Sequence, residues 1–385
     1  MIKGAYLSKT HPGRYMRSFS CSAFLCVFLL LAAASKASGS SVEVHLIDGP
    51  TSGIVALYLF DSPESFTDLR TPYRSTRFDL SEKPTLRIEG VPPGVYALLV
   101  YLDENANGRL DRNFIGIPTE PIGFSNQYVP RGPPTFPRAA FTLTNETARF
   151  DVELQRPLGD RGRIAAGVGV LGRSSPYVDS STQVVRFIPA VYYLGNRIQI
   201  FGPAAQLGIV SGDALSLALR AQYQPGVYKE KDSPILEGLG NRRDTMLLGL
   251  AGGWSAPNRF ELSASYSHDV LDRVGGGLGR LSLSRTIPAG PVRITPSIGL
   301  NWLSAKMGND FFGVPASRAT PTRPAYRLSD TWNGTAGLNL FIEVTPNWQA
   351  ILGIGAERLN SQITRSPIVA DDWVWNGFFS LGRVF

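Results

Sequence analysis

The residues best suited to chemistry lie in one acidic stretch, residues 103–111. Side-chain oxygens occupy positions 1, 3, 5 and 9 of this stretch, from Asp103, Asn105, Asn107 and Asp111. Gly108 at position 6 permits a sharp turn, and Arg109 at position 7 offers a backbone carbonyl. This spacing matches the first three quarters of an EF-hand loop, whose hard oxygens suit calcium. The sequence therefore predicts a calcium site formed by Asp103, Asn105, Asn107, Arg109 and Asp111.

The end of this stretch departs from the calcium pattern. Position 12 is Phe114, where a bidentate Glu belongs. Glu104 or Glu120 could complete the shell, and two Asn ligands lower its charge, so we expect weak affinity and a structural role. The alternative is a loop in which Asp and Asn side chains cap backbone amides and hold no ion.

No other residues form a catalytic pattern. His45 and His268 are far apart in the chain, and His268 with Asp269 has no identifiable nucleophile. The Gly-rich stretch 275–279 lies in a β context without a following helix, so it is not a phosphate loop. We therefore predict that the protein is not an enzyme.

The N-terminus has the pattern of a cleaved secretory signal, predicted over residues 1–37. Basic residues precede an apolar run at 24–34, which is too short to span a bilayer, and small residues follow. Cys21 and Cys26 leave with this segment, so the remaining chain has no disulfide or thiolate site. Removing its five Lys/Arg lowers the net charge from +7 to +2, which gives no case for nucleic-acid binding.

Two halves with different patterns follow. Residues 41–155 contain short β-rich runs separated by Gly, Pro and Asp turns, which predicts a β-sandwich domain. Residues 160–385 alternate apolar and polar side chains in segments of about ten, as in 214–223, 259–268 and 331–343. The connections between these segments alternate between long and short, which is typical of an outer-membrane antiparallel β-barrel.

The strand count depends on residues 197–210, which form one long strand or two short ones broken at Gly202-Pro203. Bacterial barrels have even strand numbers, so we predict twelve strands, with ten as the alternative. An even number puts both ends of the barrel, and the N-terminal domain, in the periplasm.

Aromatic residues support the barrel. The segment 375–385 alternates to a terminal Phe385, and all six Trp lie in the second half, most of them at predicted strand ends. Interfacial aromatic girdles belong at such positions. The polar faces carry both signs of charge, for example Arg220, Arg280 and Glu261. They predict either a lumen filled by ion pairs or a charged pore, since twelve strands is intermediate between the two.

The second half resembles the MltA-interacting protein (MipA)/OmpV outer-membrane family. The resemblance covers residues 160–385 and rests on motifs at 176–180, 236–239, 310–314 and 366–369 and on the terminal aromatic. Phe311-Phe312 replaces the family's Tyr-Tyr, and Arg383 stands where an aromatic is usual. The family is named for scaffolding between a lytic transglycosylase and a peptidoglycan synthase.

The first half resembles a bacterial envelope β-domain family of unknown function. The matching stretches are 94–97, 103–111, 116–118 and 120–126. This resemblance implies a fold but no activity.

The sequence leaves three functions open. The first is an envelope scaffold in which the barrel sits in outer-membrane lipid and the N-terminal domain contacts peptidoglycan or the enzymes that synthesise or cleave it. The second is a channel for ions or small solutes. The third is surface adhesion through the long loops 224–242 and 304–330.

Overall fold

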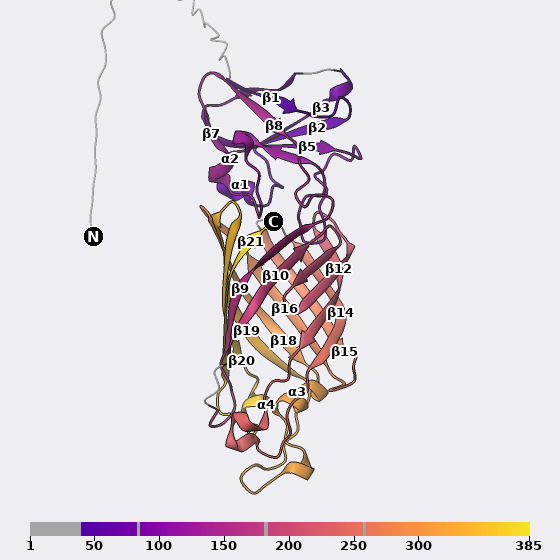
Figure 1. Cartoon of the computed structure of the whole chain (residues 1–385), viewed down its shortest axis with the longest axis vertical. Coiled ribbons are helices and arrows are strands. Elements are labelled where there is room, and N and C mark those ends of the chain that lie inside the picture. The colour runs from indigo at the N-terminus through magenta and orange to yellow at the C-terminus, as the bar shows by residue number, and fades with distance from the viewer. Residues whose placement is uncertain (1–39, 83–84, 181–183, 257–258) are drawn as a thin grey trace, which may run out of the picture. The chain divides into compact units, whose positions relative to one another are not determined.

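The computed structural model describes residues 40–82, 85–180, 184–256 and 259–385, which fall in one compact unit. The predicted signal segment therefore lies outside the described residues. The chain is mostly β-strand, with short helices in its connections (Figure 1). None of the helices in the described ranges is long and apolar enough to cross a membrane.

The N-terminal domain consists of two packed sheets. One sheet has the order β4-β1-β8, formed by β4 (Leu86–Val91), β1 (Ser40–Ile47) and β8 (Thr147–Glu153). The other has the order β3-β2-β5-β6, with β7 also paired to β5. Its strands are β2 (Ile54–Phe60), β3 (Arg74–Asp79), β5 (Gly94–Asp103), β6 (Ile122–Phe124) and β7 (Ala140–Leu143). This confirms the predicted β-sandwich fold.

Buried apolar side chains hold these two sheets together. Val42, Leu57 and Leu98 belong to one cluster that draws on both sheets, and β5 is buried along most of its length. A second cluster covers the other face of the larger sheet and includes Phe66 of α1 (Pro63–Thr67) and Ala139 of α2 (Phe136–Ala139). Both faces of β5 are therefore covered, which explains its nearly continuous apolar sequence.

The second half closes into an antiparallel barrel of twelve strands. Its order runs from β9 to β16, then through β18 to β21, and it closes because β21 pairs with β9 and β16 with β18. The first six are β9 (Arg163–Arg173), β10 (Val184–Leu194), β11 (Ile198–Phe201), β12 (Ala204–Val210), β13 (Leu215–Gln224) and β14 (Thr245–Ser255). The others are β15 (Phe260–Asp269), β16 (Gly277–Arg285), β18 (Val292–Leu303), β19 (Thr331–Thr345), β20 (Trp348–Arg358) and β21 (Trp373–Val384). A short strand, β17 (Ile287–Ala289), pairs only with β18.

The ambiguous segment 197–210 forms two strands. β11 and β12 make a short hairpin that turns at Gly202-Pro203, where Gly202 has a φ of +53° that an L side chain rarely adopts. The prediction of twelve strands is confirmed.

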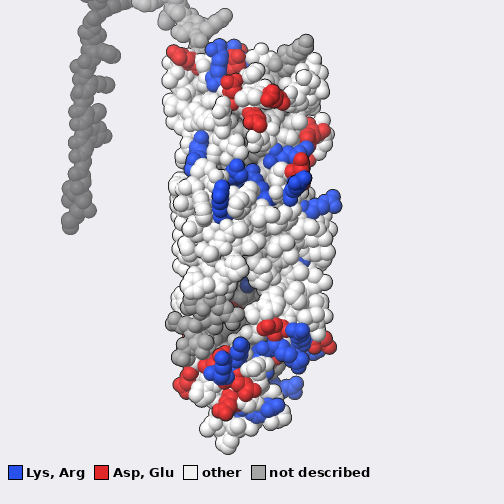
Figure 2. Space-filling model, viewed as in Figure 1, with Lys and Arg blue, Asp and Glu red and all other residues white. Residues whose placement is uncertain are grey.

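The barrel has the reverse polarity of a soluble domain. Its outward side chains are apolar and exposed, including Val168, Leu219, Leu262, Ile354 and Phe379. Figure 2 shows an uncharged band between two zones rich in Lys, Arg, Asp and Glu. An apolar band bounded by charge is the outer surface expected of a barrel in lipid.

The connections alternate as predicted. Turns such as β12–β13 and β19–β20 are short, whereas long connections follow β13, β18 and β20. The long connections carry the helices α3 (Ala305–Phe312) and α4 (Ser361–Thr364). Trp254 and Trp348 lie at strand ends beside the short turns, and Trp332, Trp373 and Trp375 at ends beside the long connections. The aromatic side chains thus occupy both rims.

Candidate functional site

The predicted calcium residues come together in one loop after β5. The carboxylate of Asp103 is buried and accepts hydrogen bonds from the backbone N–H groups of Asn107 (3.0 Å) and Gly108 (2.8 Å). The Asn105 and Asn107 side-chain amides donate to the two oxygens of Asp111, at 2.7 and 3.0 Å. The loop therefore satisfies much of its own hydrogen bonding.

Glu120 and Glu104, the two candidates for completing the shell, have different partners. Glu120 is buried and accepts from the backbone N–H groups of Glu104 (3.1 Å) and Asp111 (3.0 Å), so it joins the two ends of the loop. Burial raises the pKa of the Glu120 carboxyl. Glu104 instead forms an ion pair with Arg156 at 2.5 Å. No group of three or more His, Cys, Asp or Glu with metal-site spacing occurs among the described residues. Calcium binding here stays a prediction.

Phe114, the departure at position 12, has a packing role that the sequence did not reveal. Its ring lies against Gly208 of β12, so close that a Cβ on Gly208 would stand 2.3 Å from the ring. Beside it, the Asn113 side-chain amide donates to the Gly195 carbonyl at 3.4 Å. Arg109 lies 3.8 Å from Asp213 in the β12–β13 turn. The end of the predicted calcium loop therefore contacts the short-turn end of the barrel.

A second stretch of the N-terminal domain, the proline loop 130–134, contacts the same end of the barrel. Arg163 donates to the Pro130 carbonyl (3.0 Å), Gln349 to the Arg131 carbonyl (3.2 Å) and Arg293 to the Pro134 carbonyl. A Cβ on Gly132 would lie 2.5 Å from the Gln349 amide nitrogen, so a side chain there would displace the end of Gln349. The three donors belong to β9, β18 and β20, and the loop thus bridges much of the barrel mouth.

An ion pair supports this contact from the adjoining helix. Arg138 of α2 lies 3.1 Å from Glu343 of β19, whose side chain is only 10% exposed. The residues that dock the domain come from distant parts of the sequence and form no local motif. The Pro-rich composition of residues 130–137 is the one signal that could have singled out this loop.

Beneath the proline loop is a cavity of about 860 Å³ inside the barrel. The register places Ser216, Ala218, Arg220 and Gln222 of β13 on the inner face, opposite the exposed Leu219. Arginines line the cavity from both the barrel and the N-terminal domain: Arg70, Arg112, Arg131, Arg163, Arg220, Arg259, Arg280 and Arg293. Glu261 is an acidic residue of the same wall.

The lumen arginines of β13 and β16 are not neutralised by carboxylates. Arg220 donates to the Gln222 side-chain oxygen at 2.8 Å, and Arg280 donates to Asn301 at 3.1 Å. Neither forms a salt bridge within the described ranges. Of the two predicted kinds of lumen, this wall matches a cationic surface better than a set of ion pairs.

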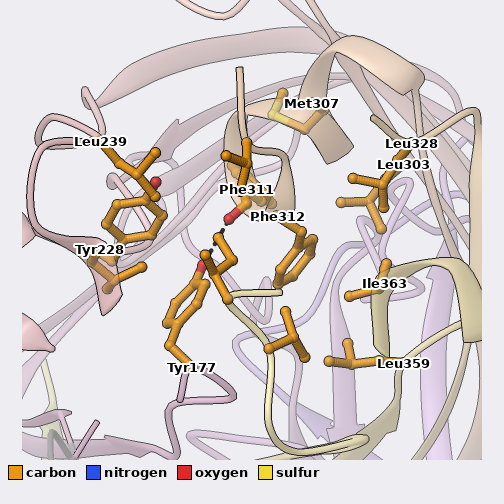
Figure 3. Close-up of a cluster of buried hydrophobic side chains, with 14 of the residues drawn as sticks. Tyr177, Tyr228, Leu239, Leu303, Met307, Phe311, Phe312, Leu328, Leu359 and Ile363 are labelled. Atoms are coloured by element: carbon orange, nitrogen blue, oxygen red, sulfur yellow. Dashed lines mark hydrogen bonds between the residues drawn. The ribbon is translucent and has the colours of Figure 1, made fainter. Parts of the chain in front are cut away.

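The long connections pack into a hydrophobic cluster, which we call the cap (Figure 3). Tyr177 donates through its hydroxyl to the Phe311 carbonyl at 3.1 Å, and Ser366 donates to the Phe312 carbonyl at 2.6 Å. Burial raises the pKa of the Tyr177 phenol. Arg323 is 5% exposed and donates to the Ile235 and Glu237 carbonyls, at 2.6 and 2.7 Å.

The cap explains the sequence motifs of the second half. Tyr177, Leu236, Phe312, Val314 and Ile368 come from all four motif stretches and meet in this one cluster. Phe311 and Phe312 are buried in it, so phenyl rings suit positions where the family has Tyr. The motifs are therefore packing residues of the cap.

The two histidines of the described residues have other partners than a nucleophile. His268 Nδ1 lies 3.1 Å from the Tyr266 hydroxyl, and His45 pairs with Asp151 at 3.2 Å on the N-terminal sheet. Asp269 accepts from Thr245 and from the backbone N–H groups of Leu271, Val274 and Gly275, so it organises the β15–β16 connection.

A closed twelve-stranded barrel with an apolar outer band, a polar lumen and a fused β-domain defines an outer-membrane β-barrel protein. Residues 166–385 match the family model described as MltA-interacting protein MipA, and the chain belongs to this family. Residues 42–151 match the family described as "Uncharacterized protein conserved in bacteria (DUF2141)". Both resemblances drawn from the sequence are confirmed.

The curated relatives include an MltA-interacting protein and several proteins named as outer membrane proteins. The chain is 27% identical over 227 residues to the MltA-interacting protein of Escherichia coli K12, covering 58% of this chain and 88% of the relative. It is 26% identical over 166 residues to the outer membrane protein OmpV of Vibrio cholerae, covering 43% and 64%. The protein is located in the outer membrane of a Gram-negative bacterium, with its N-terminal domain in the periplasm.

Among solved structures, similar chains include the COG4313 outer membrane channel from Pseudomonas putida F1 (11% identity, TM-score 0.33, covering 59% of this chain and 98% of that one). The N-terminal β-barrel domain of Pseudomonas aeruginosa OprF is another (13% identity, TM-score 0.21, covering 58% and 97%).

Proposed function

We propose that the protein is a non-enzymatic envelope scaffold, in which the barrel holds the N-terminal domain in a fixed orientation to contact peptidoglycan or its synthesising and lytic enzymes. The observation that carries this proposal is the docking of the domain at two places. The proline loop is held by Arg163, Arg293 and Gln349, and Phe114 packs on Gly208. A flexible tether would not need such contacts, whereas a scaffold gains from them because a preorganised surface loses less entropy when it binds.

The sheet β4-β1-β8 supplies a surface for a partner. Its exposed side chains carry both signs of charge, with His45 beside Asp151 (3.2 Å) and Arg149 beside Glu43 (3.5 Å). Such exposed pairs contribute little to stability, so a partner can replace them at low cost. The name of the relative in Escherichia coli, MltA-interacting protein, supports a lytic enzyme as the kind of partner.

The test is the binding of purified MltA to the full-length protein in detergent, measured by biolayer interferometry. We expect the double variant Glu43→Lys and Asp151→Lys to weaken binding at least tenfold. The matched control, Arg318→Glu with Arg365→Glu in the long connections at the opposite end of the barrel, should bind as the wild type does. No binding by the wild type would refute the scaffold, and equal binding by both double variants would exclude this sheet as the surface.

The arginine-lined cavity favours a second candidate function, a channel that the N-terminal domain closes. The proline loop contacts the mouth of the barrel at its short-turn end. The wild type should then conduct little in planar bilayers. The triple variant Arg163→Ala, Glu343→Ala and Gln349→Ala should show openings because it loses three contacts to the domain. Gln222→Ala, a lumen change away from the docking contacts, should stay silent, and silence in all three proteins would contradict the channel.

A further inference from the structure

The barrel wall is incomplete beside β10. β10 pairs with β9 along its full length, from Val184 to Leu194. On its other side only Tyr192, Tyr193 and Leu194 pair with β11. The β11–β12 hairpin turns back at Gly202-Pro203, so no described strand pairs with residues 187–191 on the side away from β9.

Pro189 lies in the middle of this unpaired edge. The Gly195 N–H donates to the Ile198 carbonyl, so the backbone groups of Gly195 face β11. Because successive residues of a strand face opposite neighbours, those of Tyr193, Val191 and Pro189 face the same side. Pro189 therefore has its missing N–H on the open edge. Proline inside a strand is tolerated at such an edge and would break a ladder elsewhere.

This edge lies within the apolar band. Phe187 pairs with Val170, which pairs with Phe379 near the middle of β21. Phe187 is 84% exposed. Unpaired peptide groups cost several kcal/mol each in hydrocarbon, so open sheet edges do not face lipid. The groups along residues 187–191 must instead meet water from the lumen or a ligand that fills the gap.

The gap leads into the cationic cavity. The rings of Tyr192 of β10 and Phe201 of β11 lie 4.6 Å apart, centroid to centroid, and both line the cavity together with Arg220 and Arg280. Phe201 is 42% exposed and marks the boundary between the apolar opening and the polar interior. A guanidinium has five N–H donors, and Arg220 and Arg280 each make one side-chain hydrogen bond, to an amide oxygen. Most of their donors are therefore available to an anion.

We propose that this gap is a lateral passage by which an anionic amphiphile passes between the bilayer and the barrel lumen, its charged group bound by Arg220 and Arg280 and its apolar chain lying in the gap. A free small anion would need the arginines but no opening to lipid. An uncharged lipid would need the opening but no arginines. The combination of the two selects a molecule with both an acidic head and a hydrocarbon chain.

The test uses the full-length protein in lipid nanodiscs and a palmitate analogue with a photoactivatable diazirine at its chain end. After irradiation, mass spectrometry locates the adducts. We expect labelling of the inward-facing residues Ile188, Tyr192 and Phe201. Labelling confined to the outward-facing Phe187 and Val191 would show an ordinary lipid contact and would overturn the proposal.

The arginines are tested with a matched pair of variants. Arg220→Gln with Arg280→Gln should reduce lumen labelling at least tenfold. The control Arg358→Gln, which removes an arginine that lies over Trp373 at the end of β20, should label as the wild type does. The corresponding long-chain alcohol should label the lumen poorly, and excess acetate should not compete. Full competition by acetate would show a site for small anions and refute the amphiphile.

The opening itself is tested by lengthening the β11–β12 hairpin by two residues on each side of Gly202, so that it can pair with residues 187–191. This variant keeps both arginines and should lose lumen labelling. Persistent labelling in a folded, heat-modifiable protein would show that the amphiphile arrives by another route. If the longer hairpin does not fold, the arginine pair still decides the proposal.

Discussion

Both halves of the chain alternate apolar and polar side chains along their strands, but the apolar faces point in opposite directions. In the N-terminal domain the apolar faces of β2 and β5 are turned inward, and Leu57, Phe60 and Leu98 are fully buried. In the barrel the apolar faces are turned outward, and Leu219 and Phe379 are 40% and 45% exposed. The surrounding solvent determines which face of the strands is apolar, because water favours burial of apolar side chains and hydrocarbon favours their exposure. Period-two alternation alone therefore identifies strands but not their surroundings.

The largest effect is expected when one aromatic side chain is truncated in each half. Phe60→Ala in the sandwich should cost about 3–5 kcal/mol of the unfolding free energy of the domain, because it leaves a cavity in a close-packed core. Phe379→Ala on the outer face of the barrel should cost much less in detergent, since detergent fills the space. Urea denaturation followed by near-ultraviolet circular dichroism measures both. Equal losses would mean that the barrel surface is packed like a protein core.

The same contrast can be tested by adding a charge to each face of one barrel strand instead of removing an apolar side chain. Leu219→Arg puts a cation in the apolar band and should cost roughly 2–4 kcal/mol if the residue lies near the bilayer midplane. Ser216→Arg, on the inner face of the same strand, should change stability little because Ser216 lines the lumen cavity and an arginine there does not enter lipid. Folding into lipid vesicles at increasing urea gives both values. The ranking would reverse if the faces had been assigned wrongly.

Much of this fold could be predicted from the sequence, because alternation, turn residues and connection lengths are local properties. The hairpin at Gly202-Pro203 and the twelve-strand count followed from such signals, as did the Trp positions. The docking of the domain could not be predicted. Gln349 and the Arg131 carbonyl are 218 positions apart, and nothing near either residue in the sequence indicates the contact.

The candidate sites divide in the same way. The residues of the calcium loop are consecutive, so their proximity was predictable, whereas the role of Phe114 depends on Gly208, far along the chain. The open edge of β10 is an intermediate case. Pro189 is visible in the sequence and was not used there, and only the short β11–β12 hairpin shows which side of the strand is unpaired.

Calcium should distinguish the two halves by a smaller effect. A site of millimolar affinity would stabilise the N-terminal domain by about 1.4 kcal/mol at ten times its dissociation constant, and should leave the barrel unchanged. Differential scanning calorimetry with calcium and with magnesium measures this increment. Asp103→Asn should abolish the calcium-dependent increment, whatever it does to stability without the ion. An increment of zero in the wild type would leave the loop as a set of capped turns.

The smallest effect concerns the contact that joins the two halves. Arg138 is 42% exposed and Glu343 only 10%, so the pair is partly screened by solvent and its coupling should be about 0.5–1 kcal/mol. A double-mutant cycle of Arg138→Ala and Glu343→Ala measures this coupling. The readout is the rate of limited proteolysis at the 130–134 loop, which rises when the domain is released from the barrel. The matched cycle of Arg149→Ala and Glu43→Ala, a pair within the N-terminal domain, should leave the proteolysis rate unchanged. If the Arg138–Glu343 cycle also shows no coupling, this ion pair adds nothing to the docking that the proline loop and Phe114 provide. The orientation of the scaffold would then depend on packing and on hydrogen bonds to backbone carbonyls, which are less sensitive to salt than an ion pair is.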